Sequence, residues 1–158
     1  MFYKFGFRKL AMAIQFFFQD VRIQVPERNR LKSFIESLFK KRSKRLKDLN
    51  YIFCSDEYLL GINNQFLDHD EYTDIISFNL SEDPQTIEGE IYISADRIRD
   101  NAQMNGVTVK SELHRVIFHG TLHLCGYKDK KQADKIIMTQ EEDKCLSLYL
   151  SNVPRGKS

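Results

Sequence analysis

The sequence has few of the residues that would place it in several common classes of protein. Its three cysteines, Cys54, Cys125 and Cys145, show no paired spacing, which excludes a disulfide framework and suits a reducing cytoplasm. No apolar run approaches the length of a membrane span, and there is no internal repeat or low-complexity tract. The formal net charge of +2 is too small to imply a polyanionic partner by itself. The 158 residues therefore fit one globular domain with its own core.

The two ends of the chain differ from its middle. Residues 1–11 place basic residues before apolar ones, which faintly suggests a signal peptide, but Gln15 interrupts the apolar stretch and no small-residue cleavage site follows. Met12 offers an alternative start, so we expect residues 1–11 to be a disordered extension or a mis-assigned start. We expect residues 12–152 to form a single domain and residues 153–158 to be a frayed tail.

Hydrophobic patterning predicts strands and helices in a mixed order. Short runs rich in aromatic and β-branched residues indicate strands, and apolar residues repeated at helical spacing indicate about five helices between and after them. The order favours a single α+β (mixed α/β) domain with a buried central helix. The predicted strands are 13–18, 49–54, 73–79 and 89–93, and the predicted helices begin near 26, 55, 94, 108 and 131.

The segment 112–125 is apolar on several sides, which predicts a helix buried at the centre of the domain. A buried helix is not expected to carry bare imidazoles, yet this one carries His119 and His123. Residues four apart on a helix are rotated by ~40°, so both rings leave the same face one turn apart. Their spacing allows two ring nitrogens to converge on one metal ion.

A third ligand follows the helix. Gly126 predicts its end, and the reversed chain can bring Asp129 back towards the two histidines. Histidines at this spacing can also be hydrogen-bonded core residues; the glycine, the turn and the carboxylate favour the metal site. We therefore predict one ion per chain, zinc as first choice, held by His119, His123 and Asp129.

Other ionisable residues near this motif have open alternatives. Arg115 and Glu112 precede His119 by four and seven residues and can share its face. We predict that Arg115 either binds a substrate phosphate during catalysis or hydrogen-bonds to a metal ligand. For Glu112 we predict a hydrogen bond to a metal ligand. The alternative is a salt bridge between Arg115 and Glu112. His114 falls on roughly the opposite face from His123, and we do not expect it to be a ligand.

Positive charge is concentrated in one part of the chain. Such a cluster can contact phosphates and bind RNA. The alternative is a solvated helix end, where cations complement the helix dipole. The sequence leaves both open for the cluster of Lys40, Lys41, Arg42, Lys44, Arg45 and Lys47.

The histidine motif resembles a known signature. Residues 119–129 are similar to His-Gly-x-Leu-His-Leu-x-Gly-Tyr-Asp-His of the YbeY family of bacterial metal-dependent endoribonucleases. Residues 72–78 and 89–94 look like the family's other landmarks, Pro-Thr-Asp-Val-Leu-Ser-Phe and Gly-Asp-Ile-x-Ile, and the resemblance runs from about Met12 to about Leu150. It implies a mixed four-stranded sheet packed by helices.

The resemblance also implies a function. Its members are single-strand-specific endoribonucleases, so we expect a cytoplasmic enzyme that matures the 3′ end of small-subunit ribosomal RNA and takes part in ribosome quality control. Its partners would be RNA and the ribosome or ribosomal proteins, with no DNA and no membrane. The sequence departs from the family at Asp129, where a third histidine is usual, and at Leu67, where many members have an arginine.

Three other functions compete with this one. A zinc peptidase of the zincin type carries Glu directly after the first histidine as general base, and that place is Gly120 here. A non-catalytic RNA- or ribosome-binding factor with a structural metal is compatible with Leu67 in place of arginine. A metal-free binding module would hold no stoichiometric metal.

Overall fold

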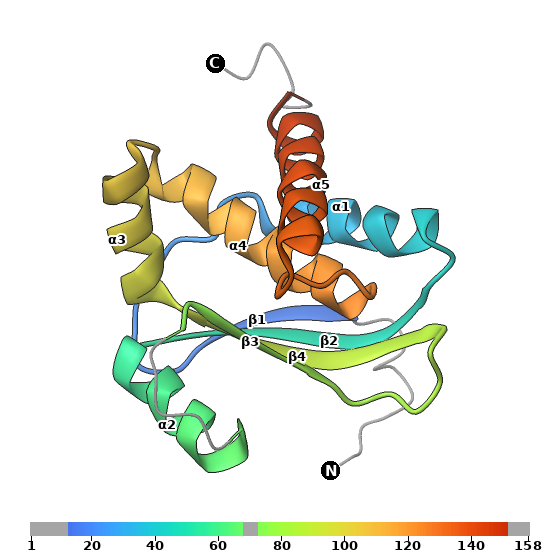
Figure 1. Ribbon diagram of the computed structural model, residues 1–158, viewed down its shortest axis with the longest axis horizontal. Coiled ribbons are helices and arrows are strands. Elements are labelled where there is room, and N and C mark those ends of the chain that lie inside the picture. Colours follow the sequence, from blue (N-terminus) through green and yellow to red (C-terminus); the bar gives the residue numbers. More distant parts are fainter. Residues whose placement is uncertain (1–12, 68–72, 152–158) are drawn as a thin grey trace.

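The computed structural model describes residues 13–67 and 73–151 (Figure 1). The predicted extension 1–11 and tail 153–158 lie outside the described residues. In these two described ranges, no helix is both long and apolar enough to cross a membrane.

The four strands form one mixed sheet, which confirms the predicted fold class. Their order across the sheet is β1-β2-β4-β3. The pairs β1–β2 and β2–β4 are parallel, whereas β3 runs antiparallel to β4 at the edge. The strands are β1 (Ile14–Phe18), β2 (Arg45–Cys54), β3 (Ile75–Asn79) and β4 (Thr86–Ser94).

Two strands are longer than the sequence predicted. β2 begins at Arg45 rather than near residue 49, and β4 begins at Thr86 rather than 89. The added residues pair with each other, Arg45 opposite Thr86, so each strand supplies the backbone partners of the other. Polar residues dominate this end of the ladder, and its two apolar residues that pack in the core, Leu46 and Ile87, are too few to mark a strand in the sequence.

The helices cover the sheet unequally (Figure 1). Four of them pack on one face around the main hydrophobic core, whereas α2 covers the other face over a small cluster that includes Leu59 and Ile76. The helices on the main face are α1 (Arg28–Lys41), α3 (Ala95–Asn105), α4 (Val109–Leu124) and α5 (Gln132–Ser151), and α2 is Asp56–Leu67.

Helix α4 is the buried helix expected at the centre. Its Ile117, Phe118 and Leu122 side chains are fully buried between the sheet and the neighbouring helices. Gly120 faces the sheet so closely that an added Cβ would lie 2.8 Å from the Cδ1 atom of Ile75 and the Cγ2 atom of Ile91. The absence of a side chain at Gly120 therefore lets α4 lie directly on β3 and β4.

Local signals set the ends of the helices as the sequence predicted. The Thr108 hydroxyl caps α4 by accepting from the Ser111 amide, and the Ser94 hydroxyl caps α3 in the same way. Gly106 ends α3 with a φ of 65°, and Gly126 follows α4 with a φ of 105°. Positive φ favours glycine, so both stops have a physical cause.

Candidate metal centre

Three donor atoms meet beside the last two turns of α4. The Nε2 atoms of His119 and His123 are 3.0 Å apart, because the two rings leave the same helix face. Gly126 reverses the chain, and the Oδ2 atom of Asp129 lies 3.1 Å from His119 Nε2 and 3.3 Å from His123 Nε2. The three residues predicted as ligands are therefore brought together, each partly buried.

Hydrogen bonds to the other ring nitrogens orient the histidines. His123 Nδ1 lies 3.0 Å from the Tyr127 carbonyl oxygen, which can only accept, so the ring hydrogen is on Nδ1. His119 Nδ1 donates likewise to the Oε2 atom of Glu142 on α5. Both Nε2 lone pairs consequently face the space beside Asp129, as metal-binding imidazoles require.

The donor set fits a small divalent ion. Two imidazole nitrogens and one carboxylate oxygen are ligands that Zn²⁺ accepts, and a tetrahedral ion with ligand distances of about 2.0–2.1 Å would separate its donors by about 3.3 Å. The observed separations of 3.0–3.3 Å are close to this value. Three protein donors leave the fourth position of a tetrahedral ion for water.

Glu142 contacts the candidate metal centre, and sequence reasoning missed it. Its side chain is almost fully buried, and its second oxygen accepts from Arg115 Nη1 at 2.9 Å. Burial lowers the pKa of His119, but the hydrogen bond and charge of Glu142, helped by Asp129, outweigh burial and raise this pKa above its ordinary value. One signal could have found Glu142: it lies between Met138 and Cys145 on the buried stripe of α5.

Arg115 and Glu112 occupy different surroundings. Arg115 pairs with Glu142 and, through Nη2 at 2.9 Å, with Asp143, so it supports the carboxylate that holds His119. Glu112 is buried, and burial raises the pKa of its carboxyl against the opposing charge of Arg115. Within the described residues, no hydrogen bond or ion pair joins Glu112 to either histidine.

His114 belongs to the core. Its Nδ1 lies 2.6 Å from the Lys110 carbonyl oxygen, and its ring packs against Phe118 and Tyr149. Burial lowers the pKa of His114, so the neutral ring is favoured. His69 lies outside the described residues.

A polar cleft opens beside the three donor atoms. Its volume is about 420 Å³. The strand β3 and the residues leading into it form the wall opposite the histidines, so polar groups face the donors from one side. The Oγ atom of Ser77 is buried and has no hydrogen-bond partner in the described part of the chain. The wall opposite the histidines is made of Thr73, Asp74, Ile75, Ser77 and Asn79.

The structure divides the predicted RNA-binding cluster. Lys40 and Lys41 are exposed at the end of α1, and neither makes an ion pair within the residues described. Arg42 is half-buried, pairs with Glu141 at 3.0 Å and lies 5.5 Å from the ring centre of Tyr127. Arg42 is thus connected to the turn that holds His123.

The last three members of the cluster are engaged at or next to the start of β2. Lys44 donates to the Pro84 carbonyl, Arg45 pairs with Asp83 at 3.2 Å, and Lys47 pairs with Glu88 at 3.5 Å. These positive charges are therefore partly neutralised by contacts within the protein. RNA binding by the cluster stays a prediction.

A three-donor site beside a polar cleft, built on the buried helix of an α+β domain, is the arrangement of a metal-dependent hydrolase. The family model "Endoribonuclease YbeY" matches residues 15–149. The chain is 53% identical to Endoribonuclease YbeY of Cytophaga hutchinsonii over 135 residues, which cover 85% of this chain and 94% of that protein. The chain belongs to the YbeY family.

Two further comparisons agree. The chain is 43% identical to Endoribonuclease YbeY of Flavobacterium psychrophilum, with 82% of this chain and 92% of that protein covered. The solution structure of TM1509 from Thermotoga maritima superposes with a TM-score of 0.58 at 25% identity, covering 92% of this chain and 99% of that one. The family and the fold expected from the histidine motif are confirmed.

Proposed function

We propose that this protein is a metal-dependent endoribonuclease that cuts single-stranded RNA and matures ribosomal RNA at the 3′ end of the small-subunit molecule. It would act in the cytoplasm in contact with the ribosome or ribosomal proteins and take part in ribosome quality control. The single observation that carries the proposal is the triangle of His119 Nε2, His123 Nε2 and Asp129 Oδ2 at the polar cleft. Its membership of a family named for endoribonuclease activity supports the choice of RNA.

Zinc is the proposed ion, and the chain would hold its two imidazole ligands in fixed orientations. When bound, Zn²⁺ lowers the pKa of a coordinated water towards 7 and polarises a phosphoryl oxygen. Glu142 and the Tyr127 carbonyl keep the two imidazoles in the tautomer that presents Nε2. The Ser77 hydroxyl belongs to the β3 wall of the same cleft and, although buried, has no hydrogen-bond partner within the described chain.

Asp74 is a second acidic group in the cleft, besides Asp129. We propose that Asp74 acts as the general base, accepting the proton of an attacking water. The proposed catalytic set is then His119, His123, Asp129 and Asp74, with Arg115 acting by holding Glu142.

RNA would lie across the cleft beside α4. Lys40 and Lys41 are exposed and are proposed to contact phosphates, together with Arg42, Lys44 and Arg45. The half-buried Arg42 would contribute through the turn at Tyr127.

One alternative has a specific observation in its favour. Both ends of the Arg115 guanidinium are engaged by Glu142 and Asp143, so it is not free to clamp a phosphate. A non-catalytic RNA-binding factor stabilised by the metal would need no such clamp. A zincin-type peptidase is disfavoured further, because Gly120 has no space for the side chain of a general base.

The test is cleavage of single-stranded RNA with zinc supplied, comparing the wild-type protein with Asp129→Ala and with Lys130→Ala, an exposed neighbour. Cleavage by wild type and Lys130→Ala, lost in Asp129→Ala and on adding a chelator, is the expected result. Zinc binding without cleavage in any condition would favour the non-catalytic factor.

A further inference from the structure

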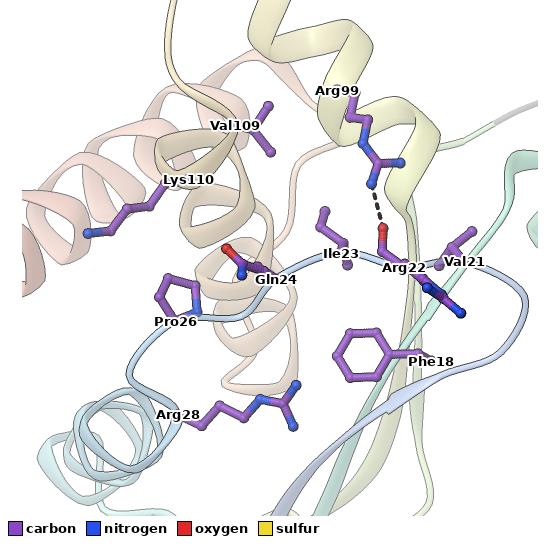
Figure 2. A pocket seen from close by; sticks show the side chains of 10 residues that line it. All are labelled: Phe18, Val21, Arg22, Ile23, Gln24, Pro26, Arg28, Arg99, Val109 and Lys110. Carbon is purple, nitrogen blue, oxygen red and sulfur yellow. Dashed lines mark hydrogen bonds between the residues drawn. The ribbon is translucent and has the colours of Figure 1, made fainter.

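A second pocket lies at the other end of α4 from the metal centre (Figure 2). Its volume is about 940 Å³, and it is bounded by the segment after β1, by α3 and by the first turn of α4. Lys110 and His119 are nine positions apart on α4, which corresponds to about 14 Å along the helix axis. The two cavities have no lining residue in common, so this pocket is separate from the metal cleft.

Positive charge surrounds this pocket. Among the described residues that line it, none is acidic, and its cations make no ion pair within the described ranges. Arg28 lies over the Phe18 ring at 5.1 Å, and Arg99 donates to the Arg22 carbonyl oxygen (Figure 2). The pocket therefore collects unneutralised charge, which suits an anionic ligand. Its cations are Arg22, Arg28, Arg99 and Lys110.

The surface between these cations is apolar and aromatic. Phe18 is partly exposed at the end of β1, where its ring stacks on Phe53 at 5.4 Å and the Arg28 guanidinium lies over it. A small inorganic anion would make no use of this apolar surface. A nucleobase would, because it stacks on aromatic rings and guanidinium planes. The other apolar lining residues are Val21, Ile23, Pro26 and Val109.

The backbone adds little to the positive potential. Helix α1 begins at Arg28, and its N-cap residue Glu27 makes no side-chain hydrogen bond to the backbone of the first turn. The first turn of α4 also lines the pocket through Val109 and Lys110. The start of a helix carries a partial positive charge. Here Thr108 already accepts from the Ser111 amide of α4, and the acidic Glu27 at the start of α1 pairs with Arg30, so the helix ends add little and the side-chain cations supply most of the positive charge.

We propose that this pocket binds a single-stranded segment of the RNA substrate away from the point of cleavage, with Arg22, Arg28 and Arg99 on phosphates and a base taking the place of the Arg28 guanidinium on the Phe18 ring. The proposal rests on the proposed function, because it takes the substrate to be RNA. An acidic protein segment would use the cations but would gain little from the aromatic surface. The combination of both features favours RNA.

The experiment measures binding without cleavage. Fluorescence anisotropy of a labelled single-stranded RNA of about 20 nucleotides, long enough to cover both cavities, is followed with EDTA present. The variants are Arg22→Gln/Arg28→Gln and Phe18→Leu, which keeps an apolar side chain. The control is Lys135→Gln/Lys144→Gln on α5, which removes the same charge from an exposed surface.

We expect the double arginine variant to bind at least tenfold more weakly and the slope of log K against log salt to fall by about 1.4, since each phosphate contact on a single strand contributes about 0.7. Phe18→Leu is expected to weaken binding about fivefold or more, through lost stacking. The lysine control is expected to change affinity less than twofold. Circular dichroism verifies that each variant is folded.

Several outcomes would overturn the proposal. Equal affinities for the double arginine variant and the lysine control would mean that only net charge matters. An unchanged Phe18→Leu affinity, with a poly-glutamate peptide displacing the RNA, would assign the pocket to an acidic protein segment. Cleavage assays with zinc run in parallel separate the two claims: RNA that binds through the pocket but is never cut contradicts the proposed function and not this pocket.

Discussion

Replacing Glu142 by glutamine tests how the metal centre is held together. The Glu142 carboxylate receives hydrogen bonds from two donors, His119 Nδ1 and Arg115 Nη1. A glutamine amide has one oxygen and one NH₂ group, so it can accept from only one of them. If its NH₂ group faces His119, the ring must accept at Nδ1 and carry its hydrogen on Nε2, which is the atom that faces the other ligands.

The size of the effect follows from the role of such supporting groups. Loss of a carboxylate behind a ligating histidine typically costs 10–100-fold in metal affinity, or about 1.4–2.7 kcal/mol. Glu142 is 7% exposed, so water cannot easily replace it. We therefore expect Zn²⁺ affinity in Glu142→Gln to fall by about 10–100-fold.

The assay is competition for Zn²⁺ against a chromophoric chelator, with Glu141→Gln as the matched control. Glu141 is the neighbouring residue and pairs with Arg42 and Lys144, not with a histidine. Nitrogen NMR of labelled histidine reports whether the His119 hydrogen moves from Nδ1 to Nε2. Unchanged Zn²⁺ affinity in Glu142→Gln, or an equal loss in Glu141→Gln, would refute the reasoning.

Two further predictions concern stability. Gly120→Ala places a Cβ atom 2.8 Å from Ile75 and Ile91, so we expect unfolding free energy in urea to fall by about 1–3 kcal/mol, whereas Gly61→Ala, which meets no atom within 4 Å, should not destabilise α2. Equal stabilities would contradict the close packing. The lowered pKa of His114 means that its stabilisation is complete above about pH 6.5 and is lost as pH falls towards its folded pKa. His114→Asn should therefore flatten the fall in unfolding free energy below pH 6.5, by at most about 1.4 kcal/mol per pH unit, and an unchanged profile would contradict it.

Much of this architecture could be predicted because its signals are local. The capping hydroxyls of Ser94 and Thr108 and the glycines after α3 and α4 act within a few residues, so spacing alone placed these helix ends. The histidine pair follows from helical geometry in the same way. The family motif then supplied the mixed four-stranded sheet, which local patterns do not contain, but not the order of its strands.

The parts that could not be predicted depend on tertiary contacts. Glu142 is 23 residues from His119, and only the packing of α5 on α4 brings the two together. Arg115 could reach Glu112 along its own helix, yet it pairs with Glu142 and Asp143 on α5. The early start of β2 likewise requires β4 as its partner. Of these features, the sequence displays only the position of Glu142 on the buried face of α5.

The central claim is that His119, His123 and Asp129 hold one metal ion. Elemental analysis of protein purified without chelators, beside Asp129→Ala and the exposed neighbour Lys130→Ala, tests it most directly. The account predicts close to one zinc per chain in the wild-type protein and in Lys130→Ala, and a clear loss in Asp129→Ala. Zinc retained undiminished by Asp129→Ala would remove Asp129 from the ligand set, and no metal in any of the three, even after zinc is supplied, would return both histidines to the role of hydrogen-bonded core residues.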